Sequence, residues 1–364
     1  MPEIRTGFVT ALYLFDVAQA IDVVALKGRL GPNADVARLD DKAAGPARLA
    51  YVQPPVIADG QAFGVAEIDG FRVRLKFFDY GIVSLMLTRP FSGSWTDLVA
   101  AAQALIESEP LERHATDACT RVAEAIRLEL KGKYATFLSE DYLIFAVTAL
   151  EPPESADALV AAHGDEIAQM LRGERQTLSR QECDHVLRSR LSYLTDDLVV
   201  PAWNAAFIYD TESAARAAIE IIEYANSQLL EFRHHDDLLD AELTRAYGRL
   251  EQPRWLDRFA GRRHTLAARH LQSIFIDVNE LTDRIENAVK FVGDVYSARL
   301  FVAVAGRLGL ERWKKNVDDK LETLDDIYRF AVERASTSQA NVLELVIVLI
   351  LVIELGLFFA GIMK

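Results

Sequence analysis

The stretch Val65–Thr88, VAEIDGFRVRLKFFDYGIVSLMLT, decides the fold of the N-terminal part of the chain. Its segments Val65–Asp69 and Phe71–Asp79 flank an Asp-Gly dipeptide, which is typical of the tight turn of a β-hairpin. A third β-rich segment, Ile82–Thr88, follows after a Tyr-Gly pair. Together the three segments predict a small, mostly antiparallel sheet.

Further strand and helix patterns surround this stretch within residues 1–150. Phe8–Phe15 and Tyr142–Leu150 are rich in strand-forming residues, whereas Trp95–Glu107 and Leu111–Leu130 have helical spacing of apolar side chains. Strands interleaved with helices are typical of an α+β fold. We therefore expect an N-terminal α/β domain built on the small sheet.

The second half of the chain has a different pattern. Residues 151–210 carry shorter elements and are expected to form a linking zone. Residues 211–340 are almost wholly helical in pattern, and their apolar positions recur at alternating steps of three and four, as in a coiled coil. A Gln-Pro pair at 252–253 interrupts the pattern, which predicts a long helical hairpin that forms a stalk. Asp236 occupies a position where this repeat expects an apolar residue.

The C-terminal segment 341–364 has the pattern of a transmembrane helix. It contains VLELVIVLILVIELGLFFAGIM over Val342–Met363, where 18 of 22 residues are apolar. At about 1.5 Å per residue this helix would reach about 33 Å, enough to cross a hydrocarbon layer of about 30 Å. Glu344 and Glu354 interrupt it, but the apolar residues outweigh one central carboxylate. A tail anchor in the bilayer is therefore predicted.

Localisation and self-association follow from this anchor. The N-terminus lacks the pattern of a signal peptide. The prediction is a single-pass protein of the cell (inner) membrane with the bulk of the chain in the cytoplasm. Intramembrane carboxylates normally face protein or water rather than lipid, so Glu354 is expected at a helix–helix interface of a homo-oligomer. Glu344, nearer the water boundary, is expected to matter less.

Composition limits the possible partners. The chain has 364 residues, with 40 Lys and Arg against 54 Asp and Glu, for a net charge of −14. An acidic body repels phosphate backbones, which argues against direct binding of nucleic acid. The two cysteines, Cys119 and Cys183, are too few for a disulfide framework or a cysteine-based zinc site.

Catalytic motifs are scarce in this sequence. It contains no phosphate-binding G-x-x-x-x-G-K-[ST] loop, no G-x-G-x-x-G after a strand and no G-x-S-x-G elbow. We expect no cofactor and a scaffold or assembly protein that acts by binding an unidentified protein partner. The alternative is a metal-dependent enzyme. Glu182 with His185, and Glu231 with His234, form two Glu-x-x-His pairs of the kind found in di-metal helical bundles.

Two segments resemble the required-for-meiotic-nuclear-division family. The run LELVIVLILVIE at 343–354 is similar to the closing segment of that family, and FDYGIVSLML at 78–87 is similar to a strand of its N-terminal domain. Leu345 stands where the family usually has Trp. The resemblance implies an α/β body, a helical stalk and a C-terminal span. It also implies an anchoring or assembly role, because eukaryotic members are mitochondrial inner-membrane proteins associated with organelle translation. No catalytic residues are established for the family, so it implies none here.

Overall fold

The computed structural model describes residues 3–36, 53–106, 108–251 and 295–327, together with Ile276, 278–279, Arg329 and Val348. The described residues up to His234, together with 295–312, form one compact unit. Those from His235 to Glu251, and those from Trp313 onward, belong to a second unit.

The first unit is built on an eight-stranded sheet in the order β2-β3-β4-β5-β1-β6-β8-β7. The strands are β1 (Glu3–Ile21), β2 (Ala34–Val36), β3 (Val56–Asp59), β4 (Arg72–Phe77), β5 (Ile82–Gly93), β6 (Leu130–Glu151), β7 (Leu198–Pro201) and β8 (Ala205–Tyr209). Neighbouring strands are antiparallel except β6 and β8, which run parallel. Strand β1 therefore lies in the middle, between β5 and β6.

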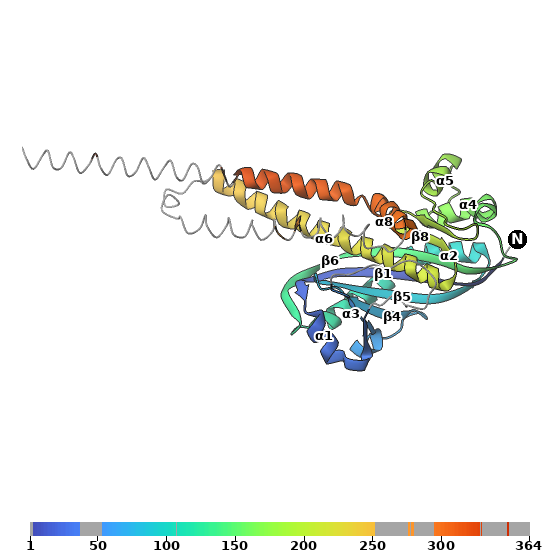
Figure 1. The fold of residues 1–364 in the computed structure, drawn as a ribbon, viewed down its shortest axis with the longest axis horizontal. Coiled ribbons are helices and arrows are strands. Elements are labelled where there is room, and N and C mark those ends of the chain that lie inside the picture. The colour runs from blue at the N-terminus through green and yellow to red at the C-terminus, as the bar shows by residue number, and fades with distance from the viewer. Residues whose placement is uncertain are drawn as a thin grey trace, which may run out of the picture. The chain divides into compact units, whose positions relative to one another are not determined.

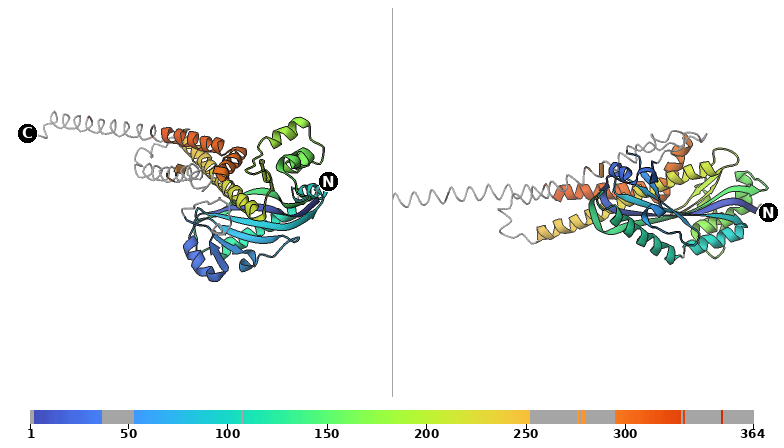
Figure 2. Two further views of the ribbon diagram at one scale, coloured as in Figure 1. Left: turned by 45° about the vertical axis from the view of Figure 1, so that its right-hand side comes forward. Right: turned by 90° about the horizontal axis from the view of Figure 1, so that it is seen from below.

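Helices lie on both faces of this sheet. They are α1 (Val23–Leu30), α2 (Trp95–Ile106), α3 (Glu109–Ala125), α4 (Ala156–Arg172), α5 (Arg180–Leu187), α6 (Glu212–Glu251) and α8 (Val295–Leu308), with 3-10 turns η1 (Gly31–Asn33) and η2 (Gly60–Phe63) and a further helical stretch over 310–327. In the first unit, α2 and α3 cover one face, and the N-terminal half of α6 runs along the other (Figures 1 and 2).

The two faces of the sheet differ in chemistry because side chains alternate along each strand. The residues of β1 in the apolar core under α2 and α3 include Val9, Ala11, Tyr13, Phe15 and Val17. The alternate positions, which face α6, include the buried polar residues Thr10 and Asp16. The chain therefore places its main apolar core on one face and much of its buried polar chemistry on the other.

The connection between β4 and β5 is fixed against β1. Gly81 has a φ of +90°, which favours glycine, and a Cβ there would collide with the carbonyl oxygen of Ala18. The backbone N–H of Val17 donates to the carbonyl of Gly81 at 3.0 Å. The turn that begins the β5 strand is thus held in place by the central strand of the sheet.

The predicted hairpin at the Asp-Gly dipeptide is only partly correct. Asp69 and Gly70 both have positive φ, 49° and 77°, as a tight turn requires. However, the segment before them is not a strand, because only an isolated bridge joins Ile68 to Phe71. The true hairpin pairs β4 with β5. The third expected strand is confirmed, since β5 contains Ile82–Thr88.

The prediction of a small, mostly antiparallel sheet is wrong in size, because the sheet has eight strands. The sheet is also mixed, since β6 and β8 run parallel. Two differences account for this. Strand β6 runs over 22 residues, far longer than the expected Tyr142–Leu150. Strands β7 and β8 come from the predicted linking zone and pair with β6 through β8.

The predicted coiled-coil stalk also needs correction. Helix α6 is 40 residues long, but its residues up to His234 belong to the sheet-bearing unit rather than to a separate stalk. A repeat of three and four apolar steps marks one buried helix face, and in the N-terminal half of α6 that face lies against a sheet. In the second unit, Asp236 forms an ion pair with Lys320 at 2.7 Å, which explains a polar residue within the repeat. The part of the predicted hairpin that follows the Gln-Pro pair, up to residue 294, lies outside the described residues except for Ile276 and 278–279.

The predicted membrane-spanning helix is corrected as well. Across the part of the chain that the structure describes, no helix is both long and apolar enough to cross a bilayer. Helix α6 has the length but carries charges along it, such as Arg216, Glu223 and Arg233, and α8 has only 14 residues. Within the described residues, the structure therefore contradicts the predicted tail anchor and the membrane localisation based on it. The segment 341–364 itself, with Glu344 and Glu354, lies outside the described residues except for Val348.

Candidate functional site

Strand β4 carries a row of three cations, Arg72, Arg74 and Lys76, at alternate positions of the sequence RVRLKF. Because side chains alternate along a strand, the three project from the same face of the sheet. Contacts between Lys76 and α6 identify this face as the one along which α6 lies. The row therefore begins outside the cover of α6 and ends beneath it.

The covered end of the row is closed by two carboxylates. The ammonium of Lys76 forms ion pairs with both Glu220 and Glu223 of α6, and the side chains of Lys76 and Glu223 are only 3% and 1% exposed. Burial lowers the pKa of Lys76, but the charges and hydrogen bonds of the two carboxylates outweigh it and leave the pKa above its ordinary value. Lys76 is thus a charged structural group.

Other polar groups extend this covered end. The hydroxyls of Tyr80 and Ser227 are hydrogen-bonded at 2.7 Å and join the β4–β5 connection to α6. Within the described residues, Oε1 of Glu223 and Oγ of Ser84 are buried without a hydrogen-bond partner. Helix α6 is therefore attached to this part of the sheet by polar contacts as well as by apolar packing.

The uncovered end of the row has no comparable partners. The half-buried guanidinium of Arg74 donates to the thioether sulfur of Met86 at 3.1 Å, which is a weak acceptor, and within the described part of the chain it forms no ion pair. Asp59 stands opposite Arg74 in the sheet, but its Oδ1 accepts from the backbone N–H of Gln61. Most of the hydrogen-bonding capacity of Arg74 is therefore open to a ligand.

Arg72, the first cation of the row, is nearly as free. Its guanidinium lies 3.7 Å from a carboxylate oxygen of Glu67, and the Arg72 and Glu67 side chains are both exposed. An exposed pair of this kind contributes little stability and is readily exchanged for another partner. Arg72 stands opposite Thr88 on β5, so a hydroxyl lies beside it on the sheet.

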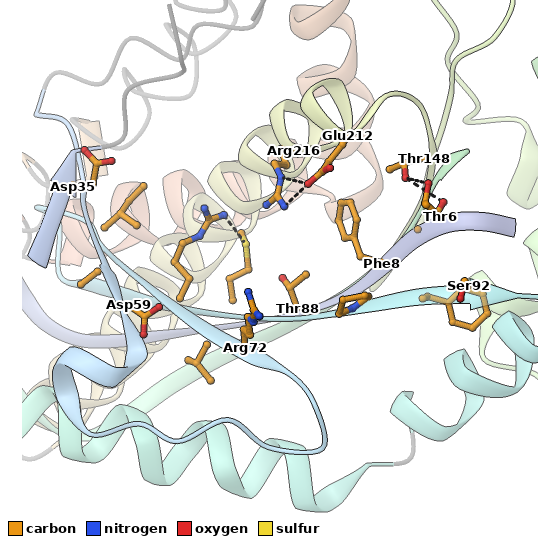
Figure 3. A pocket seen from close by; sticks show the side chains of 18 of the residues that line it. Thr6, Phe8, Asp35, Asp59, Arg72, Thr88, Ser92, Thr148, Glu212 and Arg216 are labelled. Atoms are coloured by element: carbon orange, nitrogen blue, oxygen red, sulfur yellow. Dashed lines mark hydrogen bonds and ion pairs between the residues drawn. The ribbon is translucent and has the colours of Figure 1, made fainter. Parts of the chain in front are cut away.

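A groove of about 840 Å³ lies on this face of the sheet, and Arg72, Arg74 and Thr88 are among the residues that line it. Figure 3 shows Glu212 and Arg216 on the α6 side of the groove, with Arg72 and Thr88 on the strands below them. Four arginines line the groove, namely Arg5, Arg72, Arg74 and Arg216, against three acids, Asp35, Asp59 and Glu212. The groove thus has a small cationic excess in a chain whose net charge is −14.

The floor and wall of the groove are partly apolar. Phe8, Met86 and Pro90 line it, and the guanidinium of Arg216 lies 5.6 Å from the centre of the Phe8 ring. Glu212 holds Arg216 at 2.7 Å, so Arg216 is a paired wall residue rather than an open cation. A concave, partly apolar surface with a few convergent polar groups is typical of a binding site.

A second polar cluster lies farther along α6. Nδ1 of His234 is 2.8 Å from Oδ2 of Asp16, and the His234 ring stacks on Tyr134 with centres 4.7 Å apart. Burial raises the pKa of Asp16, and the hydrogen bond and charge of His234 offset only part of that rise. Arg233 pairs with Glu140 of β6 nearby. These contacts attach α6 to β1 and β6.

The four residues of the predicted metal site contact different partners in the structure. On α5, Glu182 pairs with Arg172 at 2.7 Å, and the carbonyl of His185 accepts from Arg307. On α6, Glu231 accepts a long hydrogen bond from Gln228 at 3.4 Å, and His234 contacts Asp16. In the described ranges, no group of three or more His, Cys, Asp or Glu residues could hold a metal ion.

The groove was missed by the sequence reasoning, although a signal for it is present. The alternation Arg-Val-Arg-Leu-Lys at 72–76 places cations on one face of an expected strand and apolar residues on the other. What the alternation could not show was which cations α6 would neutralise, because Glu220 and Glu223 lie far away in the sequence.

Comparison with known proteins gives a family but no activity. The family described as "Uncharacterized protein MJ0711, N-terminal domain" matches residues 6–215. The chain is similar to the uncharacterized protein MJ0711 of Methanocaldococcus jannaschii, with 25% identity over 233 residues that cover 64% of this chain and 70% of that protein. No solved structure matches. The matched region contains the sheet except the first three residues of β1, and every residue that lines the groove except Arg5 and Arg216.

Proposed function

This chain belongs to the MJ0711 N-terminal domain family of uncharacterised proteins, and we propose that it acts by binding, not by catalysis, as a scaffold or assembly protein. The groove over β4 and β5 is the binding site in this proposal, and its occupant is an acidic segment of a protein partner. The resemblance to the required-for-meiotic-nuclear-division family stays a hypothesis.

The observation that carries this proposal is the state of Arg74. A guanidinium has five N–H donors, and a half-buried one is normally paired with a carboxylate. The contact that the structure gives Arg74 is to the sulfur of Met86. An incoming carboxylate could accept two parallel hydrogen bonds from Arg74, which is a strong and geometrically specific arrangement.

Charge and size favour a short acidic segment over a long polyanion. The net charge of −14 repels an extended phosphate backbone, whereas the groove itself has four arginines against three acids. A volume of about 840 Å³ accommodates a few side chains of a partner. The apolar surface at Phe8 and Pro90 suits an acidic segment that also carries apolar residues.

The metalloenzyme alternative is less favoured. Of its four residues, Glu182 is paired with Arg172 and His234 with Asp16, so both would have to exchange their partners to bind a metal. A polar group already held in an ion pair is a poorer ligand than one left open, as Arg74 is for an anion.

A photo-cross-linking experiment tests the proposed function. A photoreactive amino acid at Ser92, an exposed groove residue, should yield a discrete cross-linked protein in cells. Because the contact depends on charge, Arg74→Gln should abolish the product. The same amino acid at Arg113, on α3, should give no such product.

The outcomes are distinct. A product that persists unchanged in the Arg74→Gln background, or no product from Ser92, would overturn the proposal. Mass spectrometry of the product also reports on the predicted homo-oligomer, since self-association would give a dimer of this chain.

A further inference from the structure

The covered end of the β4 row shows which chemistry suits these cations. Glu220 and Glu223 are three residues apart on α6, so they project from one side of the helix one turn apart. Both carboxylates contact Lys76. The molecule thus contains one example of a helix that presents two carboxylates to this face of β4.

The two arginines of the uncovered end have a spacing close to that of such a pair of carboxylates on a helix. Arg72 and Arg74 are two residues apart on a strand, which separates their Cα atoms by about 6.6 Å. Side chains three or four residues apart on a helix have Cβ atoms about 5–6 Å apart. One helical turn of a partner therefore matches the spacing of the two arginines.

We propose that Arg72 and Arg74 bind a helical segment of the partner that carries two carboxylates one turn apart. This inference rests on the proposed function and names the motif that the groove recognises. Arg74, which is half-buried, anchors one carboxylate through paired N–H donors. The exposed Arg72 exchanges its loose contact with Glu67 for the second carboxylate.

The acids of the groove do not oppose this arrangement strongly. Glu212 is held by Arg216, and Asp59 accepts from the backbone N–H of Gln61. Arg5 is exposed at the rim and, in the described part of the chain, is in no ion pair, so it adds a positive charge there. Apolar residues of the partner helix that flank its carboxylates would meet Phe8 and Pro90 in the groove.

Synthetic peptides test the motif on the full-length chain. The probe is a fluorescein-labelled helical peptide of about 15 residues with one Glu-x-x-Glu pair, measured by fluorescence anisotropy at low salt. Replacing either Glu by Gln should weaken binding about tenfold, and replacing both should abolish it. A peptide of the same composition, with a proline that breaks the helix between the two Glu residues, should bind as poorly as the double replacement.

Variants of the protein provide the matching controls. Arg72→Gln and Arg74→Gln should each reduce affinity for the Glu-x-x-Glu peptide at least tenfold. For a peptide with one Glu, one of these two variants should reduce the affinity more than the other, because each arginine binds one carboxylate. Arg113→Gln, which removes an exposed arginine of α3, should leave the affinity unchanged.

The results separate this inference from the proposed function. Equal affinity for the helical and helix-broken peptides, or equal losses for Arg74→Gln and Arg113→Gln, would overturn the helical two-carboxylate motif. If the cross-link from Ser92 still depends on Arg74 in that case, the groove binds a partner in another way and only this inference fails. If the cross-link is also absent, both fail.

Discussion

Lys76 and Arg74 are two residues apart on the same strand and the same face of the sheet, yet their surroundings are opposite. Lys76 is buried under α6 between two carboxylates, whereas Arg74 lies beyond that cover with a thioether as its neighbour. The difference depends on where α6 crosses the strand. Position along one row therefore decides whether a cation stabilises the fold or is available to a ligand.

The two ends should also differ in energy. Breaking a buried ion pair by removing one partner is costly because it leaves an uncompensated charge. Among the described residues Arg74 is in no ion pair, so its removal leaves no partner charge uncompensated there. The following changes test this contrast, from the largest expected effect to the smallest.

Lys76→Met should reduce the free energy of unfolding by about 3–5 kcal/mol, because Glu220 and Glu223 would be left buried without a cation. Urea denaturation measures this loss. The triple variant Lys76→Met, Glu220→Gln, Glu223→Gln should recover most of it. A single variant as stable as the wild type would show that the pair is not buried as described.

High pH should weaken the covered end. The folded state holds the Lys76 proton more tightly than the unfolded chain does, since the pKa of Lys76 is raised above 10.5 by Glu220 and Glu223 against the effect of burial. This stabilisation is complete below about pH 10.5 and is lost as the pH rises through the higher pKa of the folded protein, by up to about 1.4 kcal/mol per pH unit. The stability difference between the wild type and the triple variant should shrink over that range. A pH-independent difference would contradict the assignment.

Tyr80→Phe should cost about 0.5–1.5 kcal/mol, the usual contribution of one hydrogen bond, because it removes the contact with Ser227. Thermal unfolding can measure the change. Ser227→Ala should have a similar effect, and the double variant should lose less than the sum of the two. Strict additivity would mean that the two hydroxyls do not act as a pair.

Arg74→Leu should change the free energy of unfolding by less than about 0.5 kcal/mol, since Arg74 forms no ion pair with any residue that the structure describes. The same urea measurement applies, with Lys76→Met as the contrasting variant. A loss comparable to that of Lys76→Met would show that Arg74 is a structural cation, which would remove the basis of the proposed groove.

Local patterns predicted several elements well. The expected strand Ile82–Thr88 is part of β5, and the expected helix Trp95–Glu107 corresponds to α2. These segments form because alternation and helical spacing are local properties of the sequence. The Asp-Gly turn also forms, but its first expected strand does not, because a turn residue fixes only the backbone around it.

The packing of segments that are far apart in the sequence could not be predicted from local patterns. The pairing of β6 with β8 joins segments separated by α4 and α5, and no local pattern indicates it. The heptad-like spacing of α6 was interpreted as a coiled coil, although the same spacing serves a helix that packs on a sheet. The groove could not be predicted either, because its α6 wall, Glu212 and Arg216, faces the strands only once the helix packs on the sheet.

The central position of β1 has a consequence for synthesis of the protein. β1 leaves the ribosome first, but β5 begins at Ile82 and β6 ends at Glu151, so its two neighbours arrive much later. At about 5–20 residues per second, the nascent chain carries an unpaired apolar strand for on the order of ten seconds. Such a strand is a template for aggregation. We therefore expect cotranslational chaperones to contact Glu3–Ile21 until β6 has been translated.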